Sequence, residues 1–280
     1  MKGLAVGTDP PVRLPLVAAI VMSILSGCGS PGPGATANRT FSTPPTPTTT
    51  LMSTPSSTPA PSSTPAPSST PAIQDVMKIA NFAPLEPGSY FIDPDGDEST
   101  PLRVVYEIPA AGWIQWIGAA KCTDEGCIGM TITTVSNLVT DGCHDHSWAD
   151  PPVAPSVDDL VAALAGLAPF EVTSPPSDVT FGGYGGKHLA WTVPDLPVEE
   201  VGDDTRFSGC IDGVLKSWVA FVDTEPGDAY YGYGLGDREE FWILDVAGTR
   251  LMISAGRSSG PTPADLAELR TVLDSIRIEP

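Results

Sequence analysis

The chain has 280 residues, with 14 Lys or Arg against 34 Asp or Glu and a net charge of −20. This length allows one or two domains. The acidic balance argues against nucleic acid as a partner and against a polybasic contact with anionic lipid, because both need clustered basic side chains.

The N-terminal segment has the pattern of a secretion signal. Lys2 and Arg13 are its only basic residues, and the apolar stretch Leu14–Leu25 follows them. Twelve helical residues cover about 18 Å, whereas a spanning helix must cross about 30 Å of hydrocarbon. We therefore expect residues 1–27 to be a cleaved signal peptide and not a membrane span.

The apolar stretch ends in Leu25-Ser26-Gly27-Cys28, which resembles the lipobox of bacterial lipoproteins. The resemblance implies that Cys28 becomes the mature N-terminus and carries diacylglycerol on its thiol, with an amide-linked acyl chain. More than one buried chain makes such an anchor lasting. The expected location is the extracytoplasmic face of the bacterial cell membrane. The alternative is an ordinary cleaved signal followed by a chance cysteine.

Residues 28–72 have the composition of a disordered tether. Ser, Thr, Pro, Ala and Gly dominate, and the hexamer Ser-Ser-Thr-Pro-Ala-Pro occurs at Ser56 and Ser62 and begins again at Ser68. Few apolar side chains and frequent proline leave nothing to offset the chain entropy of folding. We therefore expect the domain to stand away from the membrane, held there only by the lipid.

Residues 73–280 are expected to form one globular domain, because short β-type runs recur between Gly, Pro and Asp. The clearest pair is 240–246 with 249–255, joined by Ala247-Gly248, and its Phe241–Leu244 run is typical of a central strand covered on both faces. The other predicted strands are 89–92, 102–108, 113–117, 130–139, 187–193 and 215–222.

Two helices are predicted between and after these strands. Ser156 with Asp159 has the spacing of a helix N-terminus, and the last helix begins near Pro263 with an apolar stripe from Leu266 to Ile276. A mainly antiparallel sheet with one central and one C-terminal helix is an α+β fold. The turn Ile108–Trp113 and the segment Ala267–Ile276 resemble the Mog1/PsbP-like domains of secreted lipoproteins, which implies a fold and no activity.

The cysteines that remain after Cys28 are even in number, which predicts two disulfides in an exported domain. Three pairings are possible; Cys122 and Cys127 close easily through a turn, which leaves Cys143 with Cys210. A zinc site that uses these thiols is the alternative.

Two histidines are candidate metal ligands. His144 and His146 would share one face of a strand, and with Asp145 or Asp150 they could hold a divalent cation. The alternative is a polar loop before the Ser156 helix.

Gly256-Arg-Ser258-Ser-Gly260 matches the nucleophile-elbow pattern, but Pro261 follows and no histidine lies beyond it, so we expect a turn there.

Three tyrosines are candidate ligand-binding residues. Tyr230, Tyr231 and Tyr233, with Trp218 and Trp242 nearby in the sequence, could present an aromatic platform for a glycan or a peptide. The alternative is core aromatics beside a Gly-Tyr loop. The 33 acids beyond the leader offer too many carboxylate pairs for any one to indicate a glycosidase.

These features favour a lipid-anchored extracytoplasmic binding or structural module without catalysis. The expected partner is cell-wall material or another protein; no cofactor is expected, and the domain is expected to be monomeric. The alternative function is a metal-binding or metal-dependent lipoprotein that uses His144 and His146.

Overall fold

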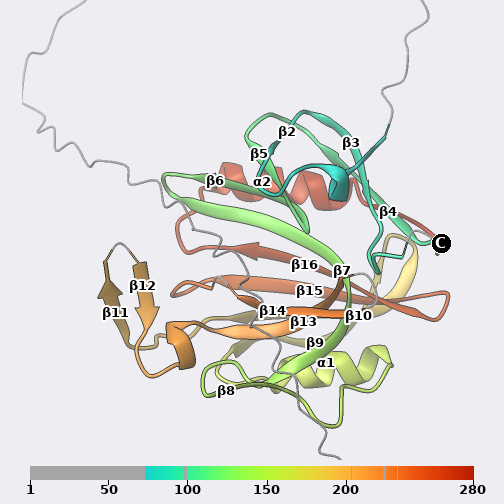
Figure 1. Cartoon of the computed structure of the whole chain (residues 1–280). Coiled ribbons are helices and arrows are strands. Elements are labelled where there is room, and N and C mark those ends of the chain that lie inside the picture. Colours follow the sequence, from blue (N-terminus) through green and yellow to red (C-terminus); the bar gives the residue numbers. More distant parts are fainter. Residues whose placement is uncertain (1–72, 98–99, 203, 223–224, 232) are drawn as a thin grey trace, which may run out of the picture. The chain divides into compact units, whose positions relative to one another are not determined.

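The computed structural model describes residues 73–280, except 98–99, 203, 223–224 and 232 (Figure 1). The predicted signal peptide, Cys28 and the tether 28–72 lie outside the described residues. In the described part the strands are mostly antiparallel and two α-helices accompany them, which confirms the α+β class. The finer resemblance to Mog1/PsbP-like domains stays a prediction.

One large sheet carries most of the strands (Figure 1). Its long strand β7 (Gly126–Asp141) pairs through its first half with its neighbours on both sides, and through its second half with β13 (Lys216–Val222). β7 therefore joins two parts of the sheet. The order is β2 (Pro84–Leu85), β5 (Trp113–Trp116), β6 (Gly118–Thr123), β7, β16 (Thr249–Arg257), β15 (Arg238–Val246), β10 (Tyr184–Thr192) and β9 (Glu171–Phe181); β14 (Glu225–Tyr231) pairs with β13 and β8 (Asp145–Trp148) with β7.

Two smaller sheets complete the β-structure of the described residues. One has the order β1 (Gln74–Asp75), β3 (Gly88–Ile92), β4 (Arg103–Ile108) and β17 (Arg277–Glu279), and the other is the hairpin of β11 (Val198–Val201) and β12 (Asp204–Phe207). Short 3₁₀ turns lie at Val76–Lys78 and Ile211–Gly213.

Both predicted helices are present, and each begins where its capping residue allows. Helix α1 (Val157–Ala165) starts after Ser156, whose side chain accepts from the backbone N–H of Asp159 in a capping box. Helix α2 (Pro263–Asp274) has the same arrangement between Thr262 and Asp265. No helix in the described ranges is long and apolar enough to cross a membrane.

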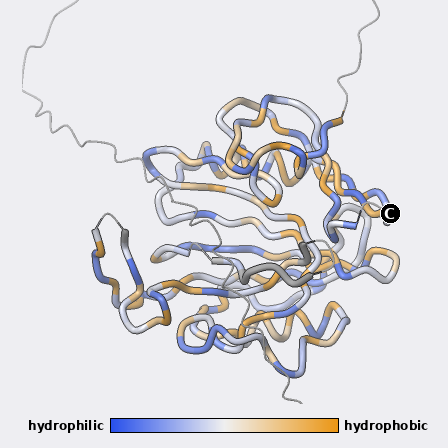
Figure 2. The backbone as a smooth tube through the Cα atoms, in the orientation of Figure 1, coloured by the Kyte–Doolittle hydropathy of each residue, from blue (hydrophilic) through white to orange (hydrophobic). Residues whose placement is uncertain are grey.

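Each side of the large sheet has its own apolar core. Because side chains alternate along β15, Trp242 and Leu244 join the core that α2 covers, whereas Phe241 and Ile243 join the core beside α1. The prediction of a central strand buried on both faces is thus confirmed. Ala247 and Gly248 both have positive φ and form the expected two-residue turn to β16. Figure 2 shows the alternation of apolar and polar residues along the backbone.

Candidate functional site

An open groove of about 530 Å³ lies on the α1-side face of the large sheet, where β5, β6, β7, β16 and β15 run side by side. Its base is one row of residues that face one another across these strands: Ile114, Ala120, Gly129, Gly256 and Glu239. Three consecutive positions of the row are Ala or Gly. The groove exists because these positions place almost no side chain above the sheet.

Gly256 shows how open the groove is. A Cβ added to Gly256 would meet no atom within 4 Å, and the residue has no positive φ that would require glycine. At Gly129 an added Cβ would lie 3.2 Å from the Cβ of Ala120, so that position is tighter. The space above Gly256 is therefore not filled by neighbouring protein.

The arginines beside the row point away from the groove. Arg238 and Arg257 are one residue from Glu239 and Gly256, so their side chains lie on the opposite face of the sheet. There they line a separate hollow of about 200 Å³ beside α2, together with Leu266. Both residues are also among those that line the groove, but neither forms an ion pair with Glu239 or Asp237 among the described residues.

The walls of the groove are aromatic. Phe82 and Trp116 lie on the β5 side, with 5.2 Å between ring centroids. On the opposite side stand Phe207, Tyr230 and Tyr233. The groove therefore offers apolar contact along both walls, as ligand clefts commonly do.

Glu239 is the one strongly buried acid of the groove. Its side chain is 4% exposed, and the Tyr233 hydroxyl donates a 2.7 Å hydrogen bond to its Oε2. The hydroxyl of Ser254 and the indole N–H groups of Trp191 and Trp218 also lie near enough to lower the pKa of this carboxyl. Burial outweighs these donors and raises the pKa of Glu239 from 4.5 to about 7.

The two indole N–H groups near Glu239 have no partner of their own. Trp191 and Trp218 are each 1% exposed, and neither Nε1 atom makes a hydrogen bond that meets normal geometry. Unsatisfied buried donors are uncommon in folded proteins. If Glu239 is ionised, small side-chain adjustments would let its carboxylate accept a hydrogen bond from each indole N–H.

Asp237 is the second acid that lines the groove, and it lies near Glu239 at the β15 end of the row. Its Oδ2 accepts a 2.7 Å hydrogen bond from the backbone N–H of Gly234. Burial raises the pKa of Asp237 from 3.8 to about 6. Among the described residues, neither Asp237 nor Glu239 forms an ion pair with Lys, Arg or His.

The structure brings together part of the predicted tyrosine platform. Tyr230 stacks on Trp218 with 4.6 Å between centroids, and Tyr233 meets Tyr230 at 5.2 Å with the rings nearly perpendicular. Trp242 lies in the other core, against Phe181 and His188, so it does not belong to this cluster. The side chain of Tyr231 lies outside the described residues. The tyrosines that can be placed thus line a groove and do not form an exposed platform.

The histidines of the metal hypothesis each contact other groups. The His144 side chain is 69% exposed and its Nδ1 lies 3.4 Å from Asp141, while Nε2 of His146 lies 2.9 Å from the carbonyl oxygen of Gly142. The carboxylate of Asp145 accepts from Ser147. In the part of the chain that the structure describes, no three His, Cys, Asp or Glu side chains are grouped to hold a metal ion.

The described residues contain two disulfides, Cys122–Cys127 and Cys143–Cys210. The first lines the groove at the β6–β7 hairpin. The second joins the turn after β7 to the segment that precedes β13. Ser258 of the rejected nucleophile pattern accepts a 2.8 Å hydrogen bond from the backbone N–H of Cys127.

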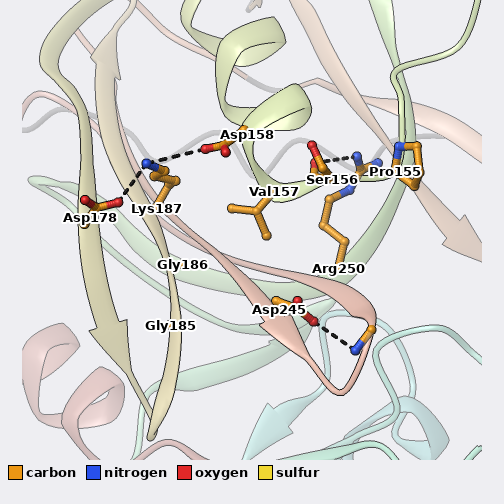
Figure 3. A pocket seen from close by; sticks show the side chains of 11 residues that line it. Pro155, Ser156, Val157, Asp158, Asp178, Gly185, Gly186, Lys187, Asp245 and Arg250 are labelled. Carbon is orange, nitrogen blue, oxygen red and sulfur yellow. Dashed lines mark hydrogen bonds and ion pairs between the residues drawn. The ribbon is translucent and has the colours of Figure 1, made fainter.

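A second hollow, of about 420 Å³, is polar and lies beside the start of α1 (Figure 3). Lys187 bridges Asp178 at 2.7 Å and Asp158 at 3.4 Å. Arg250 donates to the backbone carbonyls of Val135 and Ser156 at 3.0 and 3.2 Å, and also to that of Ala154. Both cations are thus used to fasten α1 to the sheet, which favours the apolar groove as the ligand site.

In the sequence, Glu239 is one of many acids. The signal that distinguishes it is positional: Glu239 shares a strand face with Phe241 and Ile243, both fully buried. An acid on the apolar face of a strand requires buried partners. The small residues Ala120, Gly129 and Gly256 carry no such local signal, because only the strand register aligns them.

Comparisons with known proteins add little. No family model matches the chain, and no curated protein matches its sequence. A solved structure titled "Crystal structure of LpqN involved in cell envelope biogenesis of Mycobacterium tuberculosis" aligns with 71% of this chain and 90% of its own, at 10% identity and a TM-score of 0.29. A score this low does not show a shared fold.

Proposed function

We propose that this protein is a lipid-anchored extracytoplasmic binding module of a bacterial cell envelope. Cys28 carries the lipid, residues 28–72 space the domain from the membrane, and the groove over Gly129 and Gly256 holds an apolar or amphipathic small molecule. The proposal includes no catalytic step and no resident cofactor.

Its location is supported by the leader and by the disulfides. The lipobox-like Leu25-Ser26-Gly27-Cys28 directly follows a short apolar stretch, as in exported lipoproteins. Disulfides persist in oxidising compartments and are rare in the cytosol. The pairs Cys122–Cys127 and Cys143–Cys210 therefore agree with export.

The observation that carries the binding proposal is the open space over Gly256. Strands of an ordinary core place branched or aromatic side chains over the sheet, and an empty apolar surface beside aromatic walls costs free energy unless something covers it. The groove has such a surface, from Phe82 and Trp116 across to Tyr230 and Tyr233. A ligand with an apolar body would cover it.

The test is to fill the groove with a side chain. N-phenyl-1-naphthylamine, an uncharged apolar dye, should fluoresce on binding to the wild-type protein. Gly256→Leu should weaken this binding about tenfold or more, because the leucine occupies the ligand's place. Gly185→Leu is the matched control: Gly185 also lies in a strand, also has open space around an added Cβ, and lines the polar hollow instead.

If Gly256→Leu binds the dye as the wild type does, or if Gly185→Leu weakens it equally, the groove is not the site. Thermal unfolding of both variants checks that each is folded. A saturating signal that is lost only in Gly256→Leu supports the proposal.

The anchor has its own test. Cells that express the full chain are fed an alkyne-bearing fatty acid, and the protein is probed for the label by click chemistry. Wild type should be labelled and sediment with membranes, while Cys28→Ala should carry no label. Label that persists in Cys28→Ala contradicts acylation at that thiol.

A further inference from the structure

We propose that the groove selects molecules that join an apolar body to a positively charged ammonium group, and that the ammonium binds at the end formed by Glu239, Asp237, Tyr230 and Tyr233. This inference rests on the proposed function, since it requires that the groove is a ligand site. It goes beyond that function by naming the chemistry of the ligand.

The first support is uncompensated negative charge. Glu239 and Asp237 both line the groove, and neither has a cationic partner among the described residues. Arg238 and Arg257 send their side chains to the other face of the sheet. Arg206 packs its methylene groups near Gly213, and no ion pair among the described residues joins it to either carboxyl. This end of the groove therefore holds two carboxyl groups that no ion pair of the described residues neutralises.

The protein as a whole has the same sign of charge. The whole chain has a net charge of −20, so its field attracts cations toward a low-dielectric cleft lined with acids. An anionic amphiphile would meet repulsion both at long range and at the binding end.

The second support is the aromatic lining. Tyr230 and Tyr233 both line the groove, and their rings meet at 5.2 Å with an interplanar angle of 75°. Trp218 stacks behind Tyr230, and Phe170 meets the edge of Tyr233 at 4.9 Å. Ring faces attract cations, and walls of this kind recognise substituted ammonium groups.

The third support is the pair of unpartnered indoles. Trp191 and Trp218 are nine-tenths buried or more, and their Nε1 donors lie near Glu239 without a hydrogen bond. A cation in the groove would favour the ionised carboxylate, which can then accept from both indoles as well as from Tyr233. Ionisation of Glu239 would thus satisfy both buried indole donors, and a cation in the groove favours that ionisation.

The experiment compares three probes that share an eight-carbon chain: octyltrimethylammonium, octyl glucoside and octyl sulfate, each below its micelle concentration. Affinity for the full-length protein is measured by titration calorimetry at pH 8. The expected order is ammonium above glucoside above sulfate, with the ammonium about tenfold tighter than the uncharged glucoside, since a desolvated cation–π contact and a charge pair contribute that much.

Two variants locate the charge that matters. Glu239→Gln should weaken the ammonium probe about tenfold and leave the glucoside unchanged. Asp245→Asn removes one negative charge from the same strand at an exposed position by the polar hollow, and should change neither probe. If Glu239→Gln does not fold, Asp237→Asn takes its place with the same expectation.

The outcomes separate this inference from the function it rests on. If glucoside binds as tightly as the ammonium probe and Gly256→Leu abolishes both, the groove is a ligand site but the ammonium preference is overturned. Equal weakening by Asp245→Asn also overturns it, because the effect would then be general electrostatics. If no probe binds the wild type and the uncharged dye also fails, both proposals are wrong.

Discussion

The hydroxyl of Tyr233 donates a 2.7 Å hydrogen bond to Glu239, and the hydroxyl of Ser217 lies 2.8 Å from the same Tyr233 oxygen. Ser217 belongs to β13 and Glu239 to β15, so the tyrosine links two strands that do not pair with each other. Both linked residues are almost fully buried. The acid that lines the groove is therefore held in place by the same contact that joins two parts of the fold.

The first prediction concerns stability and pH. Because burial raises the pKa of Glu239 to about 7, the folded protein keeps a proton that the unfolded chain releases above about pH 4.5. The free energy of unfolding should therefore fall as the pH rises between these values, and stay level above pH 7. Glu239→Gln cannot lose a proton there, so relative to wild type it should gain about 3 kcal/mol from pH 5 to pH 8 in urea denaturation.

Asp237 and Asp93 contribute in the same direction, since burial raises the pKa of each to about 6. Their effects cancel in the difference between wild type and Glu239→Gln, because both proteins keep these two acids. If the difference in unfolding free energy between wild type and Glu239→Gln does not change from pH 5 to pH 8, the pKa of Glu239 is not raised by folding.

The second prediction separates the two groove tyrosines. Tyr233→Phe removes the donor to Glu239 and leaves the fully buried Ser217 hydroxyl without its partner, which should cost about 1–3 kcal/mol of unfolding free energy. The cost should be larger above pH 7, since a hydrogen bond to an ionised carboxylate is stronger.

Tyr230→Phe is the control, because the Tyr230 hydroxyl has no hydrogen bond among the described residues and its stacking on Trp218 is kept. Its unfolding free energy should stay within about 0.5 kcal/mol of wild type. Equal losses in the two variants would contradict the role given to the Tyr233 hydroxyl.

The strands that could be predicted from the sequence are those whose side chains favour β-structure. The run around Phe241 and the pattern from Met130 to Val139 gave β15 and β7, although β7 is longer at both ends. β6, Gly-Ala-Ala-Lys-Cys-Thr, was missed because its small residues have little β-propensity. β9 was missed because Pro175 and Pro176 read as breakers; the strand lies at the edge of the sheet, where proline is tolerated.

The groove could not be predicted in the same way. Its base depends on Ala120, Gly129 and Gly256 facing one another, and Gly129 and Gly256 are more than a hundred residues apart in the chain. Local periodicity indicates which face a residue takes, but not which residue of another strand stands opposite. The register that aligns these positions is a tertiary property.

The third prediction concerns the attachment of α2. In the sequence Glu268 lies between the apolar positions of the last helix, but the structure buries much of its side chain: Oε1 accepts from the Trp113 indole N–H and Oε2 from Lys121, each at 2.6 Å. Glu268→Ala should cost about 2 kcal/mol of unfolding free energy, because it leaves the buried indole without an acceptor.

Asp274→Ala is the matched control on the same helix. Asp274 pairs with Arg270 at 3.0 Å, but both side chains are more than half exposed, and such pairs contribute little. Apart from any change in helix propensity, Asp274→Ala should lower the free energy of unfolding by less than about 0.5 kcal/mol. Similar losses for both variants in thermal or urea unfolding would show that the Glu268 contacts do not fasten the helix.

The fourth prediction compares the two disulfides, which close loops of very different length. Cys143 and Cys210 are 67 residues apart, whereas Cys122 and Cys127 are 5 apart. In the chain-entropy account, the long loop contributes about 4 kcal/mol to the free energy of unfolding and the short loop about 2 kcal/mol. Replacing Cys143 and Cys210 together by Ser should therefore lower the urea midpoint more than the same change at Cys122 and Cys127. Non-reducing peptide mapping of the wild type confirms which cysteines are joined before the comparison.

The double replacement at Cys122 and Cys127 should instead weaken dye binding, because that disulfide lines the groove and the other does not. The opposite ranking of stabilities, or dye binding that responds only to the Cys143 pair, would contradict this assignment.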